Sequence, residues 1–394
     1  MSHRMGAAGA ADSRLIVALL MLGAAVLVVA FGMVGVAALT PGSVPPSDFS
    51  AFWVAARMAL RGEAALAYDR DVFVHAVSAA LGVTPNPLLV WLNPPGFLVL
   101  LLPFAMLPPS LAWLAWSIGG VALVVLTLRV ILPRWGAMVA VLAAPASLVN
   151  LGFGQNGAIT ASLLALGLEW LDRRPVAAGF CFGLMTYKPQ FGLVLPVLLA
   201  ATGRWRCFTA AAGTASALAL VSVGLFGIEP WRAFFASLSP NAEFALHPPD
   251  WALMKLQSVA VALLRAGAPG AIAWPVHAAV ALGALALAYR LWRLPGDVAP
   301  EARAVATLAA MFLSTPYVLV YDGMALGMAG VFLTRAAMRD GAQPGEMVLI
   351  ALALALPLSL LFVTVYLVLP ASWLIMLGLA VRRGMGMRAS AFGT

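Results

Sequence analysis

The stretch LIVALLMLGAAVLVVAFGMVGVAAL, residues 15–39, contains no charged residue and runs directly into the proline-rich segment TPGSVPPSDF. A helix that crosses a bilayer needs about 20 apolar residues, whereas the apolar region of a cleaved signal peptide has about 7–15. We therefore predict an uncleaved first transmembrane helix. The chain of 394 residues is 63% hydrophobic and 10% charged, against about 25% charged residues in soluble domains. These proportions predict an all-α polytopic membrane protein that forms one integral-membrane domain over residues 1–394.

Further apolar runs follow along the chain, and arginine clusters separate them. Runs long enough to span a membrane are 110–132, 206–227, 268–292, 318–337, 346–363 and 365–382, and shorter runs are 135–149, 156–171, 175–187, 189–202 and 302–316. Arginines flank these runs at 129–134, 173–174, 204–206, 290–303, 335–339 and 382–388. The positive-inside rule places such clusters on the cytoplasmic side, so each intervening stretch must cross the membrane and return. We predict about 12 spans, both termini in the cytoplasm, and outer loops over about 40–109 and about 228–267.

The first outer loop begins with an amphipathic pattern. Phe49, Phe52, Trp53, Ala56 and Leu60 occupy the i, i+3, i+4, i+7 and i+11 positions of one helical face. A helix with one apolar face and one polar face lies in the plane of the membrane interface. We therefore expect interfacial helices on the outer side of the membrane in this loop.

Several functional classes are disfavoured by the sequence. The formal net charge is +8, but no basic patch with interleaved aromatic residues is present, which argues against nucleic-acid binding. Cys181 and Cys207 form no metal-ligand pattern and should lie in different segments, so we predict no disulfide. Walker A, H-E-x-x-H and G-x-S-x-G motifs are absent, which disfavours ATP-driven pumps, zinc proteases and typical hydrolases. Asp69-Arg70-Asp71 has the D-x-D shape of nucleotide-sugar enzymes but falls on the outer side, where nucleotide sugars are absent.

A few polar residues stand at the outer ends of apolar segments. Ionisable residues at membrane depth are costly, so each is a candidate functional residue. By the predicted topology Asp48, Lys188 and Asp322 lie on the outer side, with the Gln155-Asn156 turn beside them, and we expect their side chains to meet in one cavity. Each also has a structural interpretation: Asp48 as an N-cap or first-turn residue, Lys188 as a lysine reaching the interface, and Asp322 as a helix cap or salt-bridge partner.

An ordered set of short motifs runs from about residue 14 to 340: Asp48-Phe49, Ala55-Ala56-Arg57, Gly62, Tyr68-Asp69, Asn93-Pro94-Pro95, Gly154-Gln155-Asn156, Lys188-Pro189 and Gln257-Ser258. Through this set the chain resembles glycosyltransferase family 87, the polyprenol-phosphate-sugar-dependent transferases that include mycobacterial phosphatidylinositol-mannoside mannosyltransferases. Two departures stand out. Asn93 takes the place of a frequent tyrosine, and Tyr317 to Asp322 replaces a segment that often contains histidine. The resemblance implies a GT-C fold, a polytopic helical bundle with its active site on the outer face.

The resemblance also implies roles for individual residues. The aspartate of the first outer loop, here Asp48, is the expected general base. Cations should surround the phosphate that leaves with the donor lipid, and the candidates are Lys188, Arg57 and Lys255. Candidate substrate-binding residues are Tyr68, Asn93, Gln155, Asn156, His247, Gln257, Tyr321 and Asp322. With a monophosphate donor and a lone aspartate, we expect neither a metal nor a cofactor.

The expected activity is transfer of a sugar, with mannose favoured, from a polyprenyl-phosphate donor to a glycolipid or cell-envelope glycan, with inversion at the anomeric carbon. The expected location is the bacterial inner membrane, with the active site facing the periplasm. A transporter or lipid flippase using the same outer cavity is the main alternative, because broken helices like the 175–202 pair occur in transporters. A structural assembly subunit is a weaker one. The sequence carries no signal for an oligomeric state.

Overall fold

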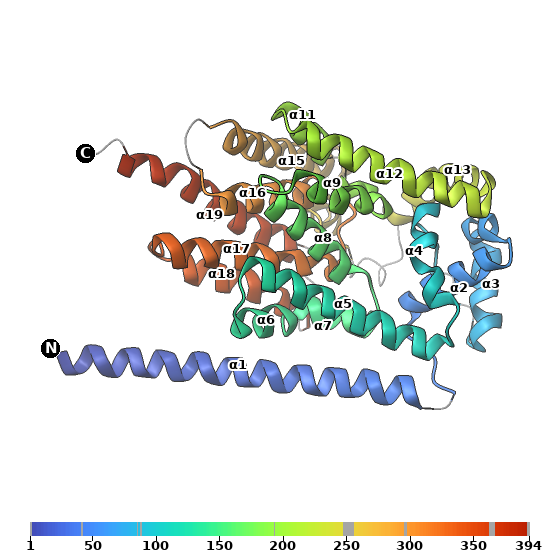
Figure 1. Ribbon diagram of the computed structural model, residues 1–394, viewed down its shortest axis with the longest axis horizontal. Coiled ribbons are helices and arrows are strands. Elements are labelled where there is room, and N and C mark those ends of the chain that lie inside the picture. The colour runs from blue at the N-terminus through green and yellow to red at the C-terminus, as the bar shows by residue number, and fades with distance from the viewer. Residues whose placement is uncertain are drawn as a thin grey trace.

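The computed structural model is a bundle of helices (Figure 1). It describes residues 2–40, 42–84, 86, 89–192, 194–246, 256–294, 298–361 and 367–391. The first half of the chain forms α1 (Ser2–Leu39), α2 (Ser47–Leu60), η1 (Ala64–Tyr68), α3 (Arg70–Leu81), α4 (Pro95–Ala105), α5 (Pro109–Ile131), α6 (Trp135–Leu142), α7 (Pro145–Phe153), α8 (Gly157–Trp170), α9 (Pro175–Leu184) and η2 (Met185–Tyr187). Several of these helices begin at proline, whose fixed φ suits a first helical position and whose missing amide hydrogen is not needed there.

The second half continues with α10 (Pro189–Gly192), α11 (Val194–Ala201), α12 (Trp205–Phe226), α13 (Glu229–Leu246), α14 (Val259–Arg265), α15 (Gly270–Arg293), α16 (Pro300–Ser314), η4 (Val320–Gly323), α17 (Met324–Asp340), α18 (Glu346–Ala355), η5 (Leu356–Leu361) and α19 (Val368–Ala391). Within the described ranges the β-structure is a single antiparallel bridge between Leu256 and Leu319. The all-helical class expected from the composition is confirmed for these ranges.

Five described helices are long and apolar enough to cross a membrane: Val17–Leu39 within α1, α5, α12, α15, and Val368–Met385 within α19. The pair α6 and α7 bends by 60° and adds a sixth if it counts as one span, and the bend falls where Pro145 interrupts the helical hydrogen bonds. The chain is therefore a multi-pass membrane protein. Shorter apolar helices, among them α4, α8, α9 and α18, lie between these spans, and the total of about 12 spans stays a prediction.

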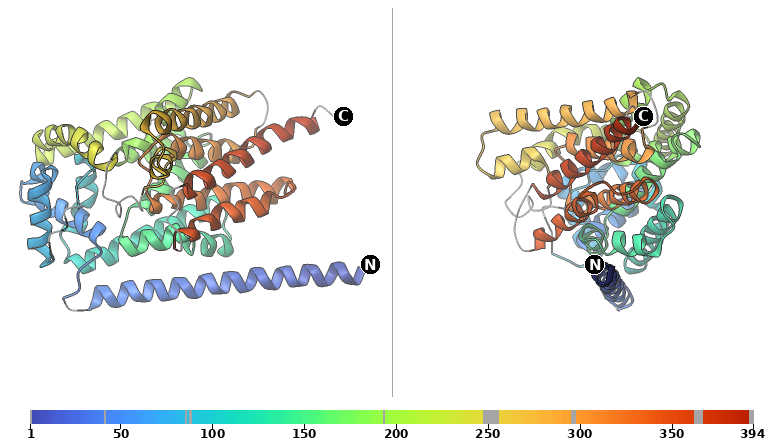
Figure 2. Two further views of the ribbon diagram at one scale, coloured as in Figure 1. Left: turned by 180° about the vertical axis from the view of Figure 1, so that it is seen from behind. Right: turned by 90° about the vertical axis from the view of Figure 1, so that its left-hand side faces the viewer.

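The bundle has two chemically different ends. At one end α2, α3 and α4 gather near the points where α1 ends and α5 begins (Figures 1 and 2); we call this the Asp48 end. The start of α1 and the end of α19 lie at the opposite end. There Arg335, near the end of α17, pairs with Glu169 at 2.8 Å and with Glu301 at 2.9 Å. We call this the arginine end, and the predicted topology places it in the cytoplasm.

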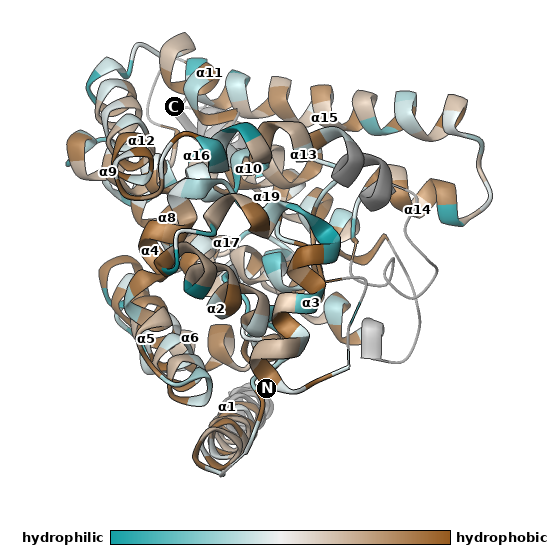
Figure 3. Cartoon of the chain, turned by 90° about the vertical axis from the view of Figure 1, so that its right-hand side faces the viewer, coloured by the Kyte–Doolittle hydropathy of each residue, from teal (hydrophilic) through white to brown (hydrophobic). Residues whose placement is uncertain are grey.

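Helix α2 carries Asp48 into the bundle. Figure 3 looks onto the Asp48 end and shows α2 and α3 on the near side of the bundle, with α1 seen along its axis at one side. The helix predicted from the periodicity is present, and its interfacial position stays a prediction. Its side chains are buried on nearly every face, with Ala55, Ala56 and Phe49 all at 0% exposure, because α4, α5 and η1 pack around it. The small side chains of Ala55 and Ala56 allow the neighbouring helices to pack closely against α2.

Candidate active site

Asp48 lies in the first turn of α2, where it is partly buried. The helix begins after Pro46, and no side-chain hydrogen bond caps it, so Asp48 is a first-turn residue and not the N-cap. Its carboxylate accepts a hydrogen bond from the side-chain amide of Gln155, with 2.9 Å between Nε2 and Oδ2. The helix dipole favours negative charge at this position. Gln155 therefore orients the Asp48 carboxyl group through a neutral donor.

The turn between α7 and α8 places Gln155 against Asp48. Gly154 has φ +64°, and a Cβ on it would lie 2.6 Å from the Cβ of Phe49, so only glycine fits there without displacing α2. The Gln155 backbone is then fixed on both sides. Its amide donates to the Asn150 carbonyl at 2.9 Å, and its carbonyl accepts from Trp116 Nε1 at 3.3 Å.

Lys188 forms a buried ion pair with Asp322. The distance from Nζ to Oδ1 is 2.5 Å, and the side chains are 7% and 0% exposed. Lys188 stands where α9 and η2 give way to α10, because Pro189 cannot continue the preceding helix. The second carboxylate oxygen of Asp322 accepts from the Leu319 amide at 3.0 Å. An ammonium group has three donors, and this pair uses one of them.

Tyr321 lies between the ion pair and the turn that carries Gln155. The Lys188 ammonium lies 5.3 Å from the centre of the Tyr321 ring. The Tyr321 backbone is also fixed closely, since a Cβ on Gly157 would lie 2.4 Å from its carbonyl oxygen. Asp48, Gln155, Tyr321, Lys188 and Asp322 therefore form one polar group at the Asp48 end; we call it the central site.

An aromatic wall supports the central site from behind. Phe49 contacts Trp116 at 6.1 Å between ring centres, Phe52 contacts Phe97 at 5.5 Å, and Phe97 stacks on Tyr187 at 4.8 Å. The wall thus links α2, beside Asp48, to η2, beside Lys188. Sequence reasoning assigned no role to this wall, because its members come from four separated segments and share no local pattern.

Tyr187 also hydrogen-bonds Thr160 on α8, with 2.7 Å between the two hydroxyl oxygens. The Thr160 hydroxyl is in addition within 3.0 Å of the Asn156 carbonyl. This contact joins the Gln155-Asn156 turn to the helix break between η2 and α10, where Lys188 lies. The sequence offered a weak signal for it: a threonine one helical turn after Asn156 in a mostly apolar helix.

Two buried amide side chains near the central site lack hydrogen-bond partners among the described residues. They are Gln257, whose Nε2 and Oε1 are both unpartnered, and Asn156, whose Oδ1 is unpartnered. Gln257 is 1% exposed. Its backbone amide donates to the Val318 carbonyl at 2.7 Å, next to the bridge between Leu256 and Leu319. Opposed residues of an antiparallel pair point to the same face, so the Gln257 side chain lies with Val318, on the side of the main apolar core.

The other candidate residues lie away from the central site or outside the described residues. Arg57 is nine residues beyond Asp48 on α2, about 13 Å along the helix axis, where it donates to the Ala105 carbonyl at 3.3 Å. Tyr68 donates its hydroxyl to the Asn93 carbonyl at 2.8 Å, and burial raises the pKa of Tyr68 well above its usual range. These contacts hold η1 against the start of α4. His247 and Lys255 fall outside the described residues.

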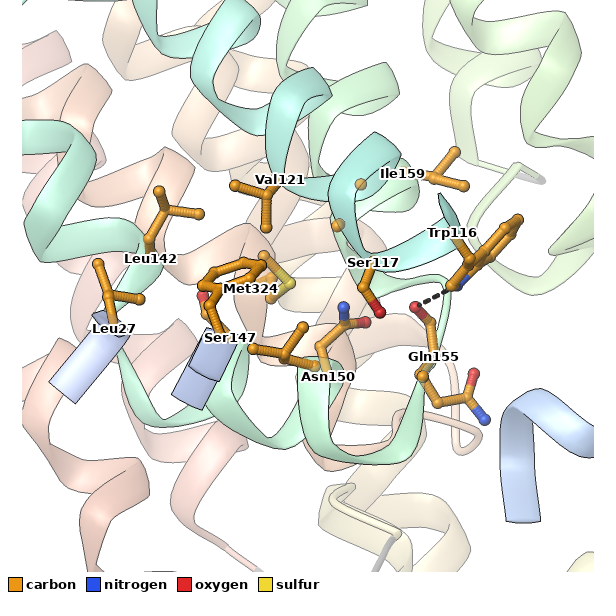
Figure 4. Close-up of a pocket in the computed structure, with 15 residues that line it drawn as sticks. Leu27, Trp116, Ser117, Val121, Leu142, Ser147, Asn150, Gln155, Ile159 and Met324 are labelled. Carbon is orange, nitrogen blue, oxygen red and sulfur yellow. Dashed lines mark hydrogen bonds between the residues drawn. The ribbon is translucent and has the colours of Figure 1, made fainter. Parts of the chain in front are cut away.

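Two pockets have linings that include or adjoin residues of the central site. The first, a small cavity of about 30 Å³, is lined by residues from α1 to Asn150 and Gln155 (Figure 4). The second, of about 280 Å³, lies between α4, η2, α12 and Trp231 and reaches Thr186 and Tyr187, which precede Lys188 in the chain. Within the described residues no group of three or more His, Cys, Asp or Glu side chains is arranged to hold a metal ion.

These features define a multi-pass helical membrane protein with a buried polar site of the kind found in enzymes. The family model for glycosyltransferase family 87 matches residues 91–321, more than half of the chain, and the chain belongs to this family. The protein is therefore a glycosyltransferase. The matched region includes Gln155, Lys188 and Tyr321; Asp48 lies before it, and it ends one residue before Asp322.

Among solved structures, the chain is similar to the crystal structure of ArnT from Cupriavidus metallidurans bound to undecaprenyl phosphate. The two share 16% sequence identity with a TM-score of 0.39, over 95% of this chain and 79% of that chain. A likeness this distant carries no argument about function. No curated protein matches the chain.

Proposed function

We propose that this glycosyltransferase moves a sugar from a polyprenyl-phosphate donor to a hydroxyl group of a glycolipid or cell-envelope glycan, with Asp48 as the general base. The observation that carries the proposal is the Asp48 carboxylate, partly buried and bonded by the neutral Gln155 amide at 2.9 Å. The amide of Gln155 orients the carboxylate, and a carboxylate within hydrogen-bond reach of the acceptor hydroxyl can take up its proton.

Lys188 is the proposed partner of the donor phosphate. Its ammonium group uses one of its three donors on Asp322, and the remaining donors suit phosphate oxygens, which gain charge as the sugar leaves. Asp322 acts as a positioning residue, since its second oxygen is fixed by the Leu319 amide. Arg57 and Lys255 remain candidates for binding the donor phosphate. Arg57 lies nine residues after Asp48 on α2.

The proposed reaction is a single displacement. The acceptor oxygen forms a bond to the anomeric carbon while the bond from that carbon to the phosphate oxygen breaks, and its electron pair stays on the phosphate. The acceptor proton passes to Asp48. Attack on the face opposite the leaving group inverts the anomeric centre. Mannose is the favoured sugar, the GT-C class the favoured assignment of the fold, and the periplasmic side of the inner membrane the favoured location, because the positive-inside rule assigns the arginine end to the cytoplasm.

The test compares Asp48→Asn with Asp71→Asn in the full chain reconstituted in vesicles. Asp71 is an exposed carboxylate on α3 in the same outer segment, so it matches the change in charge without touching the central site. Transfer from a polyprenyl-phosphate mannose is measured for both variants. Loss of a general base lowers turnover by about 10²–10⁴-fold, and we expect this for Asp48→Asn alone. Near-normal transfer by a folded Asp48→Asn protein would remove Asp48 from the mechanism.

A further inference from the structure

Three segments at the arginine end bring an excess of arginine together. Residues 172–174, 204–206 and 290–303 contain seven arginines and three acidic residues, a net charge of +4. One of the acidic residues, Glu301, already pairs with two arginines of α17. The segments lie at the ends of α8, α9, α12, α15 and α16, and Figures 1 and 3 show α9, α12 and α15 on the side of the bundle away from α1. The fold therefore gathers positive charge that is widely separated in the sequence.

Trp292, near the end of α15, lies at the centre of this region. The guanidinium carbon of Arg204 is 4.5 Å from the centre of the indole ring, and that of Arg303 is 5.5 Å from it. The indole Nε1 donates to the Thr307 hydroxyl at 2.9 Å, which fixes the orientation of the ring. Two guanidinium groups are thus held against one side chain although like charges repel each other. We call Trp292 and the arginines of the three segments the Trp292 cluster.

Arg204 retains donors for a further partner. Its Nη1 donates to Asp172, and the two side chains are 23% and 50% exposed. No described residue accepts a hydrogen bond from its Nη2 group. A guanidinium group has five N–H donors in a planar fork that matches the oxygens of a phosphate. Arg204 is therefore oriented by its neighbours and still able to bind an anion from the solvent side.

The Trp292 cluster lies where lipid-facing helices reach the predicted cytoplasmic surface. α12 and α15 are spanning helices, and only 6% and 28% of their apolar windows are buried. Tyr289 on α15 and Trp205 on α12 are 44% and 57% exposed, and each is next to an arginine. Exposed tyrosine and tryptophan mark the headgroup level of a bilayer. An acyl chain that lies along either helix therefore brings the headgroup of its lipid to the arginines.

The positive-inside rule alone does not account for this arrangement. The rule counts lysine and arginine without regard to their contacts, so fully solvated cations satisfy it equally well. Arginine differs from lysine because it stacks on aromatic rings and binds a phosphate through two parallel hydrogen bonds. All seven cations of the Trp292 cluster are arginines, and two of them lie against an indole ring. The geometry is that of a phosphate site and not of a diffuse charge.

We propose that the Trp292 cluster binds the phosphate of an anionic membrane lipid in the cytoplasmic leaflet. Arg204 donates to the phosphate through Nη2, Trp292 holds the Arg204 guanidinium in place, and the exposed Arg206 and Arg293 add positive charge. The acyl chains lie along the exposed faces of α12 and α15. This lipid is neither donor nor acceptor of the transferred sugar, because its site lies at the opposite end of the bundle from the central site.

The test is native mass spectrometry of the full chain released from nanodiscs, which counts the lipids that stay bound and needs no turnover. The nanodiscs contain equal amounts of phosphatidylglycerol and phosphatidylcholine with the same acyl chains. We expect the protein to retain phosphatidylglycerol at least about fivefold over phosphatidylcholine, because only the former carries a net negative charge. Excess inorganic phosphate, added before release, should leave this retention unchanged, because it lacks the acyl chains.

Two arginine variants separate the site from the general charge of the arginine end. Arg204→Gln should lower the retention of phosphatidylglycerol at least about tenfold, as expected for loss of a hydrogen bond from a charged donor. Its exposed pair with Asp172 contributes little to stability, so the variant should fold. Arg134→Gln is the matched control, because Arg134 is an exposed arginine before α6, close to the Ile131 carbonyl that accepts from Arg335 at the same end. It removes the same charge and should leave retention unchanged.

Trp292 variants test the site without changing the charge. Trp292→Leu should lower retention several-fold, and Trp292→Phe, which keeps an aromatic ring, should restore most of it. Four results would overturn the inference: equal retention of the two lipids; equal losses in Arg204→Gln and Arg134→Gln, which indicate a diffuse charge effect; full retention by a folded Trp292→Leu protein; or displacement of the lipid by inorganic phosphate, which makes a free anion the ligand. Loss of transfer in Asp48→Asn has no bearing on any of them.

Discussion

The two ends of the bundle hold buried charges in opposite ways. At the arginine end, both oxygens of Glu301 are bonded by guanidinium groups, from Arg335 at 2.9 Å and from Arg339 at 2.8 and 3.2 Å. Glu346 is held in the same way by Arg383, with 2.6 Å between Nη2 and Oε2. These contacts join α16, α17, α18 and α19. Each buried carboxylate there is saturated with charged donors.

At the Asp48 end the buried polar groups include neutral amides. Lys188 is bonded by a single carboxylate oxygen, and the side chain of Gln257 by nothing among the described residues. Buried polar atoms in native proteins are nearly always bonded. Unmatched ones occur at both ends, in the Arg382 guanidinium at the arginine end and in the Gln257 amide at the Asp48 end. The contrast between the ends therefore lies in the carboxylates that guanidinium groups saturate at one end and in the amide that a ligand can complete at the other.

The largest expected effect comes from breaking the saturated end. Glu301→Gln removes a 1%-exposed carboxylate that two arginines share, and breaking a buried ion pair costs about 3–5 kcal/mol. We expect a marked fall in thermal stability in detergent, with turnover per folded molecule unchanged. Glu229→Gln is the control, because its pair with Arg232 on α13 is exposed and is worth less than about 1 kcal/mol. A stable Glu301→Gln protein without activity would reverse the assignment of the two ends.

Variants of the Lys188–Asp322 pair can separate its contribution to stability from its contribution to donor binding. Either single change, Lys188→Met or Asp322→Leu, leaves one buried charge unpaired and should cost about 3 kcal/mol of stability. The double variant removes both charges and should recover most of that stability. Donor use should not recover, because no ammonium remains for the phosphate. Stability is followed by thermal unfolding and donor use by the KM for the polyprenyl-phosphate sugar; a double variant with a normal KM would make the pair purely structural.

Gly154 tests how the fold delivers Gln155 to Asp48. Gly154→Ala adds a Cβ 2.6 Å from Phe49 at a positive φ, so both strain and a clash act on α2, and we expect about 1–3 kcal/mol of destabilisation together with a several-fold loss of turnover. Gly203→Ala is the matched control: its φ is +71°, but its surroundings are open. It should show a smaller loss of stability and normal turnover. Equal effects on turnover in the two variants would mean that the turn does not position Gln155.

Helix α2 shows which features of the fold could be predicted from the sequence and which could not. The apolar runs and the spacing of Phe49, Phe52 and Trp53 predicted the helix, because periodicity depends on neighbours along the chain. Its burial was not predicted, since Ala55 and Ala56 are compatible both with a surface and with a close helix contact.

The contacts of the central site depend on residues far apart in the chain. Gln155 is 107 residues from Asp48, and Asp322 is 134 residues from Lys188. The predicted topology brought these residues to one side of the membrane, which limited the possible partners. It did not say which amide meets which carboxylate, because that choice depends on turns such as the one at Gly154 and on the packing of several helices at once.

The smallest effect, and the one with an unusual sign, is expected at Gln257. An unpartnered buried amide costs about 1–3 kcal/mol, so Gln257→Leu, which is apolar and similar in size, should keep or slightly raise thermal stability. If the amide completes its hydrogen bonds on a bound sugar, the same change should raise the KM for donor or acceptor a few-fold. Gln257→Asn keeps an amide on a side chain that is one methylene shorter. Its KM should lie between those of the unsubstituted protein and of Gln257→Leu. A Gln257→Leu protein that is both less stable and normal in KM would show that the amide serves the fold, and would weaken the contrast between the two ends of the bundle.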